Sequence, residues 1–530
     1  ESQPAGPSAA LLRDIEAEVV LSIDGERYFA SARELLAAKN QTTWLNGPLV
    51  TEWRLAAAFK DKTGNPHPHL AMKSALRVYR SGELRFDVAV ENGWAFAPAP
   101  QDYRYDVQVK FGDEVAYEKL NLLHHHLSRW RKVLWRGVEP KVLVNQDMRY
   151  LIETRAIPAY DLRVKISQQT LDTYAKALAA GDFGPMGSGL STKAMATTGG
   201  RPEIGPLPGW AAAQIVSQDP VATATTLAMG NLSGSWPIHY RDPKTDLPIT
   251  LDDFPYMTLL GTPDSAINKA TGKSEWFPSC EGRCKTPFRP DSAHQPSYAY
   301  LPYLISGDYY YLEELFFWAS WNLLEMAPPY RSYTEGLLKP GQVRAQAWSL
   351  RTLAQAAYVA PDSHPLKPYF IRRVKNNLAW YNKNFTDNED TNKLGVLTIG
   401  YAITSNDGTA LAPWQDDFFT WAVGYVWGLG FSDALPLLVW KSKFPVGRMI
   451  DPDYCWIFAS EFVVTVRKNK ISERLFENLG EAYQATVGNR TNSKGVRLGD
   501  LSCASRDMAD WLSTKWNDAK PGSVRAVPGE

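Results

Sequence analysis

The chain has 530 residues, and 57 Lys and Arg balance 57 Asp and Glu, so its formal net charge at neutral pH is zero. Such a chain has no overall attraction for nucleic acid or an anionic membrane, although a local basic patch could still bind an anionic polymer. No run of about 18 apolar residues occurs, so we expect no membrane-spanning helix. The length favours more than one domain.

Aromatic residues make up 12% of the chain, with 19 Trp and 25 Tyr. Two interpretations are equally open. Flat rings stack on the apolar faces of pyranoses, so the composition suits a protein that binds sugars. It suits a large aromatic core equally well.

Residues 16–165 alternate between apolar and polar positions, as strands do. Residues 75–80 and 83–90 flank a Ser-Gly turn and read as a hairpin, and residues 105–110 and 115–120 repeat the pattern. We therefore predict an antiparallel β-sandwich over residues 1–165. His124, His125 and His126 lie within it, but successive side chains on a strand point to opposite faces, so a packed strand is favoured over a metal site. We expect no metal or cofactor.

From about residue 167 the apolar period changes to that of helices, after which a long Gly- and Ser-rich loop follows over Gly181–Pro208. Loops of that length are usually functional or disordered. The succession of helices predicts a complete or incomplete α/α toroid over residues 166–530. The predicted helices cover residues 171–180, 210–229, 296–305, 309–326, 342–359, 363–385, 414–429, 432–441, 454–467 and 470–487.

One helical hairpin, residues 289–314, carries the most information. Its helical spacing would place His294 one turn above Tyr298 on one face. Gly307 suits the left-handed residue that closes a helix. Asp308 suits the N-cap of the next helix, where its carboxylate could accept from free backbone N–H groups.

The chain contains four cysteines. Cys280 and Cys284 are close enough for a small disulfide loop in an oxidising compartment, and the sequence leaves open whether they are bridged. Cys455 and Cys503 are predicted to be buried thiols.

Polar and aromatic residues gather at four helix entrances or loops of the helical half. We predict that these four sites converge on one cleft, with His294 facing the same cavity as His239, Arg344 and Asp416. The candidate catalytic residues are His239, Tyr240, His294, Tyr298, Arg344 and Asp416, and the candidate substrate-binding residues are Trp236, Arg241, Arg289, Trp348 and Gln415. Each has a structural alternative: His294 could be a core histidine, Arg344 an ion-pair partner, and Asp416 a complement to a helix dipole.

These residue types suit β-elimination from a uronate polymer. Arg or Gln can neutralise the carboxylate beside the acidic carbon, and His or Tyr can act as base and as acid. Hydrolysis would instead need two carboxylates about 5–5.5 Å or 6.5–9.5 Å apart. The acidic residues that could supply such a pair are Glu203, Asp242, Asp252, Asp253, Glu335, Asp416 and Asp417.

Three short runs, Trp236–Asp242, His294–Asp308 and Trp414–Asp417, make the chain resemble the exo-rhamnogalacturonan lyase-like proteins and other α/α-toroid polysaccharide lyases. The resemblance implies a β-sandwich joined to a toroid, with Tyr and His as acid and base. We therefore expect a secreted or periplasmic lyase that acts on an acidic polysaccharide or oligosaccharide, with no nucleic-acid or membrane partner. The alternatives are a glycoside hydrolase on the same scaffold and a non-catalytic glycan-binding or virion protein.

Overall fold

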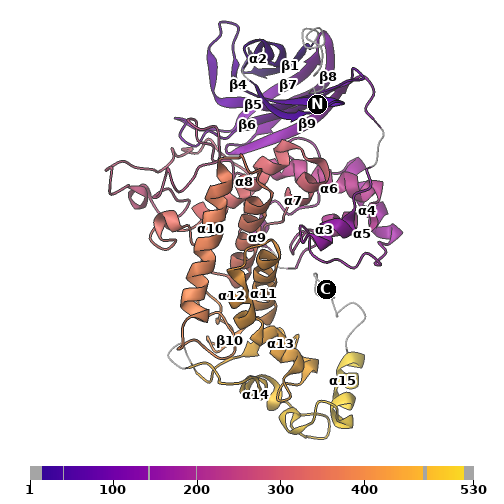
Figure 1. Ribbon diagram of the computed structural model, residues 1–530, viewed down its shortest axis with the longest axis vertical. Coiled ribbons are helices and arrows are strands. Elements are labelled where there is room, and N and C mark those ends of the chain that lie inside the picture. The colour runs from indigo at the N-terminus through magenta and orange to yellow at the C-terminus, as the bar shows by residue number, and fades with distance from the viewer. Residues whose placement is uncertain (1–14, 40, 141–143, 198–199, 470–473, 519–530) are drawn as a thin grey trace, which may run out of the picture.

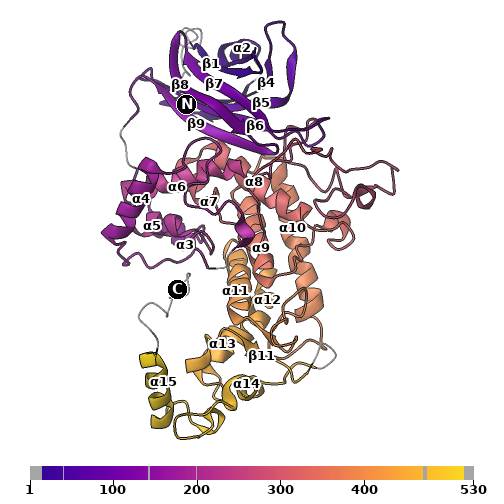
Figure 2. The same ribbon diagram turned by 180° about the vertical axis from the view of Figure 1, so that it is seen from behind.

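The structure is a computed structural model that describes residues 15–39, 41–140, 144–197, 200–469 and 474–518. The molecule is elongated. A β region lies at one end, a layer of long helices follows, and the C-terminal segment lies at the other end (Figure 1). The reverse view shows the same order along the long axis (Figure 2).

The β region is one continuous antiparallel sheet, in the order β8-β7-β1-β2-β4-β5-β6-β9, with β3 added alongside β4. Its end strands β8 and β9 follow each other in sequence and contact each other, so the sheet is strongly curved. The predicted antiparallel pairing and both predicted hairpins, β5/β6 and β7/β8, are confirmed. The predicted sandwich is not, because the strands form one continuous curved sheet rather than two sheets packed face to face. The strands are β1 Ala17–Ile23, β2 Glu26–Ser31, β3 Gln41–Asn46, β4 Val50–Lys60, β5 Pro66–Tyr79, β6 Leu84–Asn92, β7 Tyr103–Phe111, β8 Glu114–His124 and β9 Ser128–Arg136.

Helices dominate the chain after β9. A short pair of strands, β10 Ala410–Leu411 and β11 Val464–Thr465, interrupts them. The helices are α2 Ala32–Ala37 within the β region, then α3 Met148–Glu153, α4 Gln168–Ala180, α5 Gly209–Ser217, α6 Pro220–Leu232, α7 Tyr300–Ser306, α8 Tyr309–Leu324, α9 Val343–Val359, α10 Leu366–Tyr381, α11 Pro413–Gly428, α12 Ala434–Lys441, α13 Lys443–Ile450, α14 Leu479–Tyr483 and α15 Arg506–Asp518.

Helix α9 is the centre of the helical layer, because α8, α10 and α11 all pack against it. Every residue of α8 is buried, as is every α9 residue from Val343 to Ala357. A helix that is buried all round belongs to the interior of a large protein. No helix in the described part of the chain is long and apolar enough to cross a membrane.

The C-terminal segment has its own apolar core, and two predictions there are wrong. The predicted helix at 454–467 is instead a single 3-10 turn, Trp456–Phe458, followed by β11. Cys455 and Cys503 are not thiols but form a disulfide that ties the two parts of this core together. Of the predicted helix at 470–487, residues 470–473 lie outside the described residues. Residues 479–488 are helical, since α14 runs into a π-helical turn.

The hairpin around Gly307 forms as predicted at its corner but not at its cap. Gly307 adopts the left-handed conformation, with φ of 68°, and closes α7. Asp308 occupies the N-cap position of α8, yet its side chain makes no capping bond. Its carboxylate instead accepts from Arg131 at 2.5 Å and from Arg85 at 2.6 Å, both on the sheet. These strong partners lower the pKa of Asp308 despite its burial, and they fix the start of α8 to the sheet.

The second turn of α8 is bound to the sheet by further buried ion pairs. Arg129 of β9 donates to Glu314 at 2.5 Å and is also paired with Glu313. Arg241 donates to Glu313 at 2.9 Å and to Glu91 of β6 at 2.5 Å and 2.7 Å. Each of these side chains is at most 8% exposed, so every charge has its partner inside the protein.

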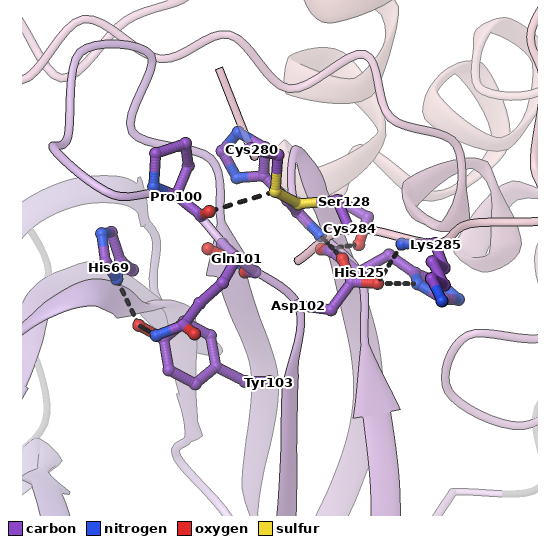
Figure 3. Close-up of a disulfide and its surroundings, with 12 residues drawn as sticks. His69, Pro100, Gln101, Asp102, Tyr103, His125, Ser128, Cys280, Cys284 and Lys285 are labelled. Atoms are coloured by element: carbon purple, nitrogen blue, oxygen red, sulfur yellow. Dashed lines mark hydrogen bonds and ion pairs between the residues drawn. A yellow bond between two sulfur atoms is a disulfide. The ribbon is translucent and has the colours of Figure 1, made fainter. Parts of the chain in front are cut away.

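A small disulfide loop contacts the segment that leads into β7. Cys280 and Cys284 are bridged, and the Cys280 sulfur lies 3.0 Å from the Pro100 carbonyl oxygen (Figure 3). Asp102 accepts from the backbone N–H of Lys285 at 2.9 Å and contacts the His125 ring at 3.0 Å. These bonds lower the pKa of Asp102 against the effect of burial. The two disulfides are compatible with an oxidising compartment.

We predict that Arg129→Met lowers the free energy of unfolding by about 3–5 kcal/mol, because it leaves Glu313 and Glu314 buried with too few cations. Urea unfolding followed by tryptophan fluorescence measures this. The control is Arg33→Met, because Arg33 pairs with Glu16 on the surface, and it should cost about 1 kcal/mol or less. Equal losses for the two variants would contradict a structural role for the network.

The disulfides predict that the unfolded, unreduced chain has no titratable thiol, and that reduction releases all four. Replacing Cys455 and Cys503 by Ser should cost about 2–4 kcal/mol, because their bridge spans 48 residues. The bridge between Cys280 and Cys284, which are 4 residues apart, closes a far shorter loop, so the same change there should cost less. Free thiols in the unreduced chain would show that a bridge is absent.

Candidate functional site

A tight turn ahead of α7 places a carboxylate and an imidazole in contact. Asp291 accepts from the backbone N–H of Ala293 at 3.0 Å, so its side chain closes its own turn. The same carboxylate oxygen binds Nδ1 of His294. In the neutral ring Nδ1 then carries the proton and Nε2 is the basic atom. Among the described residues, none forms a hydrogen bond with Nε2 of His294, and the residue is 4% exposed.

The first turn of α9 supplies a cation to the same place. Arg344 donates from Nε to Gln342 at 2.9 Å, and its guanidinium lies 5.4 Å from the Trp414 ring centre. In the described part of the chain it has no ion pair with a carboxylate. Burial lowers the pKa of Arg344, while the charge of Asp291 acts in the opposite direction. Its guanidinium is therefore free to bind the carboxylate of a ligand next to Asp291.

Glu325, at the C-terminal end of α8, adds a protonated carboxyl group. Burial raises the pKa of Glu325 to about 8; a hydrogen bond from Ser292 lowers it, and the neighbouring Asp291 raises it. The group is therefore neutral, and able to donate a proton, at neutral pH. Tyr240 is close enough to feel the charge of Glu325. Burial raises the pKa of Tyr240, and an ionised Glu325 would raise it further.

The long loop predicted to be functional contributes the remaining wall. Arg201 pairs with Glu203 at 2.8 Å and donates to the Met195 carbonyl at 2.8 Å. Both charges act on Tyr298, whose pKa burial raises well above its ordinary value. Arg201 also acts on Arg344. This loop contacts the segment just before the turn, since its backbone bonds to Arg289.

We call these groups the Asp291 cluster. It combines a basic imidazole nitrogen, an unpaired guanidinium and a protonated carboxyl group, all from different elements. Its members are Asp291, His294, Glu325 and Arg344, with Tyr240, Tyr298, Arg201 and Glu203 around them.

The cluster brings together four of the predicted catalytic residues, His294, Arg344, Tyr240 and Tyr298. It does not include the other two. The prediction that His294 faces the same cavity as His239, Arg344 and Asp416 is wrong for His239 and Asp416, which are bound elsewhere, and for Arg344 it stays a prediction, supported by the shared neighbour Asp291.

His239 and Arg241 belong to the buried network between the sheet and α8. Neither is exposed to solvent. The two ring nitrogens of His239 lie 3.0 Å from the Leu127 carbonyl oxygen and 3.0 Å from Glu314. The segment before His239 lies close against β9 at Gly234, where a Cβ would lie 2.3 Å from the Arg129 carbonyl oxygen. Both side chains are fully occupied, so we assign them structural roles.

The predicted sugar-stacking residues Trp236 and Trp348 are also interior. Both have an exposed fraction of 0%. Trp236 packs 5.1 Å from Tyr298, and Trp348 packs 5.0 Å from Phe418. Neither ring can contact a polymer from solution, so the expectation of stacking is wrong for both.

The remaining predicted residues lie at the edges of the site. Asp416 forms a buried ion pair with Lys441 of α12, and burial raises its pKa in spite of that partner. Gln415 accepts from the backbone N–H of Arg344 at 3.5 Å. Arg289 is exposed and its backbone bridges to Ala194. Asp416 is therefore structural, while Gln415 and Arg289 flank the cluster.

The described residues contain no group of three His, Cys, Asp or Glu side chains that could hold a metal ion. His124 contacts Tyr105 at 2.9 Å and the Ser128 carbonyl at 3.0 Å, and His125 contacts Asp102. His124 ends β8 and is packed as predicted, whereas His125 and His126 lie in the turn before β9, so the predicted strand is wrong for these two.

Reasoning from the sequence missed Asp291, Arg201 and Glu325 as site residues. Asp291 could have been found as the first residue of an Asx turn, because its side chain can accept from the backbone N–H of Ala293 two residues on. Arg201 lies in the loop that its length marked as functional. Glu325 gave no signal, because its pKa depends on burial at the end of a helix.

Comparisons of the chain with protein-family models, with curated proteins and with solved structures found no match. The site therefore rests on its own geometry.

The raised pKa of Glu325 predicts a pH-dependent effect of Glu325→Gln. The folded state holds this proton up to about pH 8, whereas an unfolded Glu loses it near pH 4.3. Folding therefore binds a proton between these values, and the group makes the wild type less stable as pH rises. The variant should gain more than about 1 kcal/mol relative to the wild type between pH 5 and pH 8. Urea unfolding at both pH values measures this, and a constant difference would contradict it.

Proposed function

We propose that the protein is a polysaccharide lyase that cleaves an acidic, uronate-containing glycan by β-elimination at the Asp291 cluster. One observation carries the proposal. Nδ1 of His294 is held by Asp291, no described residue bonds Nε2, and the charge of the same Asp291 acts on the guanidinium of Arg344, which has no ion pair in the described part of the chain. A base next to a carboxylate-binding cation is what abstraction of a proton α to a carboxylate requires.

In the proposed reaction Arg344 binds the uronate carboxylate and so acidifies the C5–H bond. Nε2 of His294 takes the C5 proton, and Asp291 stabilises the imidazolium that results. The C4–O bond breaks as the C4=C5 double bond forms. Glu325, which is protonated at neutral pH, gives its proton to the leaving oxygen. The products are an unsaturated uronate and a new chain end.

Aromatic side chains beside Arg344 suit the sugars on either side of the cleaved bond. Trp414 lies under the guanidinium and 6.2 Å from Phe462, which is 72% exposed. Tyr401, which is 70% exposed, lines a cavity of 50 Å³ together with Gln415. Exposed rings of this kind stack on pyranose faces. In the proposal they replace the buried Trp236 and Trp348.

The proposal extends to fold and location. We propose that the helices around α9 form an incomplete α/α toroid, in line with the resemblance to toroid lyases. We also propose a secreted or periplasmic protein, because both disulfides together use all four cysteines.

A glycoside hydrolase is the second candidate, and one observation favours it. Asp291 and Glu325 are neighbouring carboxyl groups, and burial raises the pKa of Glu325 to about 8. A carboxyl group that burial keeps protonated, next to a second carboxyl group, can act as the proton donor of such a pair. The bond between Asp291 and His294 makes elimination the better fit.

The test is incubation with a panel of uronate polymers, with detection of both new reducing ends and the ultraviolet absorbance of the unsaturated product. We expect both signals to appear together. His294→Ala and Arg344→Met should each lower kcat/KM by about a hundredfold or more, because they remove the base and the carboxylate-binding cation.

The matched control is His126→Gln, which alters a half-buried histidine of the β region and should leave the activity unchanged. Reducing ends without ultraviolet absorbance would overturn the lyase proposal and support hydrolysis. Binding of a polymer that is never shortened would instead support a glycan-binding protein.

A further inference from the structure

Two neighbouring helices meet at a lysine and an aspartate that are buried together. Asp416 lies in the first turn of α11, and Lys441 is the last residue of α12. The Nζ atom of Lys441 contacts Oδ2 of Asp416, and the two side chains are 0% and 4% exposed. Because α11 and α12 pack against each other, this contact joins two helices rather than two turns of one helix.

This burial distinguishes the pair from the other lysine ion pairs in the described part of the chain. Each of those has a carboxylate whose side chain is at least 37% exposed. The pair of Lys73 and Asp246 is the nearest equivalent, with side chains 9% and 45% exposed. Elsewhere among the described residues, ion pairs with both side chains this deeply buried use Arg or His. A guanidinium stays protonated and is no nucleophile, whereas a buried lysine can lose its proton.

Burial favours the neutral forms of both groups, because each ion loses its hydration in the interior. Burial raises the pKa of Asp416 and lowers the pKa of Lys441, although the charge of each partner acts in the opposite direction. Transfer of one proton from Nζ to Oδ2 gives an amine and a carboxylic acid in contact. A desolvated, neutral lysine amine is a nucleophile, and its nearest electrophile is the carboxyl carbon of Asp416.

The surroundings leave the two groups to each other and provide space for a leaving molecule. The neighbouring carboxylate, Asp417, has its own cation, since it accepts from Arg448. Asp416 also lines the cavity of 50 Å³ that contains Gln415 and Tyr401, which exceeds the roughly 15 Å³ that one water needs.

We propose that Lys441 and Asp416 form an isopeptide cross-link between α12 and α11 in the folded protein. Nζ of Lys441 attacks Cγ of Asp416, and the new N–C bond forms as one C–O bond breaks. The oxygen leaves as water with the acid proton and one amine proton, so no oxidant, reductant or cofactor is consumed. The product is a neutral amide, which removes two buried charges from the interior.

The cross-link would fix the first turn of α11 to α12. This turn carries Trp414 and Gln415, which lie beside Arg344. The bond also joins residues that are 25 positions apart, and so it restricts the unfolded chain as a disulfide does. The inference does not depend on the proposed lyase activity.

The experiment is mass spectrometry of the full chain after both disulfides have been reduced. We expect an intact mass that is lower than the sequence requires by one water. A tryptic digest should contain a branched peptide that joins the segment of Asp416 to the segment of Lys441, with no cleavage after Lys441. These measurements use the wild type, so they do not depend on a variant that folds.

Lys441→Arg keeps the positive charge but cannot form the amide, so its mass should match its own sequence. Asp246→Ala is the matched control, because it removes the carboxylate of the exposed Lys73 pair and should retain the loss of one water. A wild-type mass equal to that of the sequence would overturn the proposal, as would a loss of water that persists in Lys441→Arg. A loss located at an Asp-Gly step such as Asp407-Gly408, which can close to a cyclic imide, would also overturn it.

Discussion

The buried ion pairs between the sheet and α8 are the constraint on which the rest of the structure depends. Asp308, Glu313 and Glu314 enter the interior as charges, and each meets arginines that project from the sheet or from the segment beside it. Removing either side of such a pair leaves an uncompensated charge in a medium of low dielectric constant. The helix therefore cannot slide or rotate on the sheet without breaking several pairs at once. Stacking of Arg54 on Tyr309 strengthens the same contact.

Helix α8 connects this attachment to the Asp291 cluster. The helix starts among the arginines of the sheet and ends at Glu325, beside Asp291 and Ser292. Helix α9 packs along α8 and brings Arg344 to the same end. The electrostatics of the cluster thus depend on a helix whose opposite end is fixed in the β region. Turns and helix ends position each side chain of the cluster.

Local patterns in the sequence were sufficient to predict the hairpins of the sheet, the limits of α8 and α9 to within two residues, and the left-handed Gly307. The helix predicted at 210–229 is instead two helices, α5 and α6, which Pro220 separates. Local patterns failed where a residue far away in the sequence determines the conformation or the hydrogen-bond partner. Asp308 has the residue type and position of an N-cap, but its carboxylate binds arginines far away in the sequence instead of the backbone N–H groups of α8. The segment 454–467 has apolar residues at helical spacing, yet pairing of β11 with β10 and the bridge from Cys455 hold it in another conformation. The spacing of apolar residues along the chain carries no information about such long-range partners.

The same limit explains which site residues could be predicted. Residue type and position at a helix entrance selected His294 and His239 equally, and Arg344 and Arg241 equally. What separates them is unused hydrogen-bonding capacity. His239 and Arg241 have their polar atoms bound inside the protein, and so they hold the fold. His294 has one nitrogen fixed by Asp291 and the other open, and Arg344 has no carboxylate partner, so both can still bind a ligand. A polar residue becomes a candidate for chemistry when the fold orients it without satisfying it, and only the three-dimensional count of its partners reveals that.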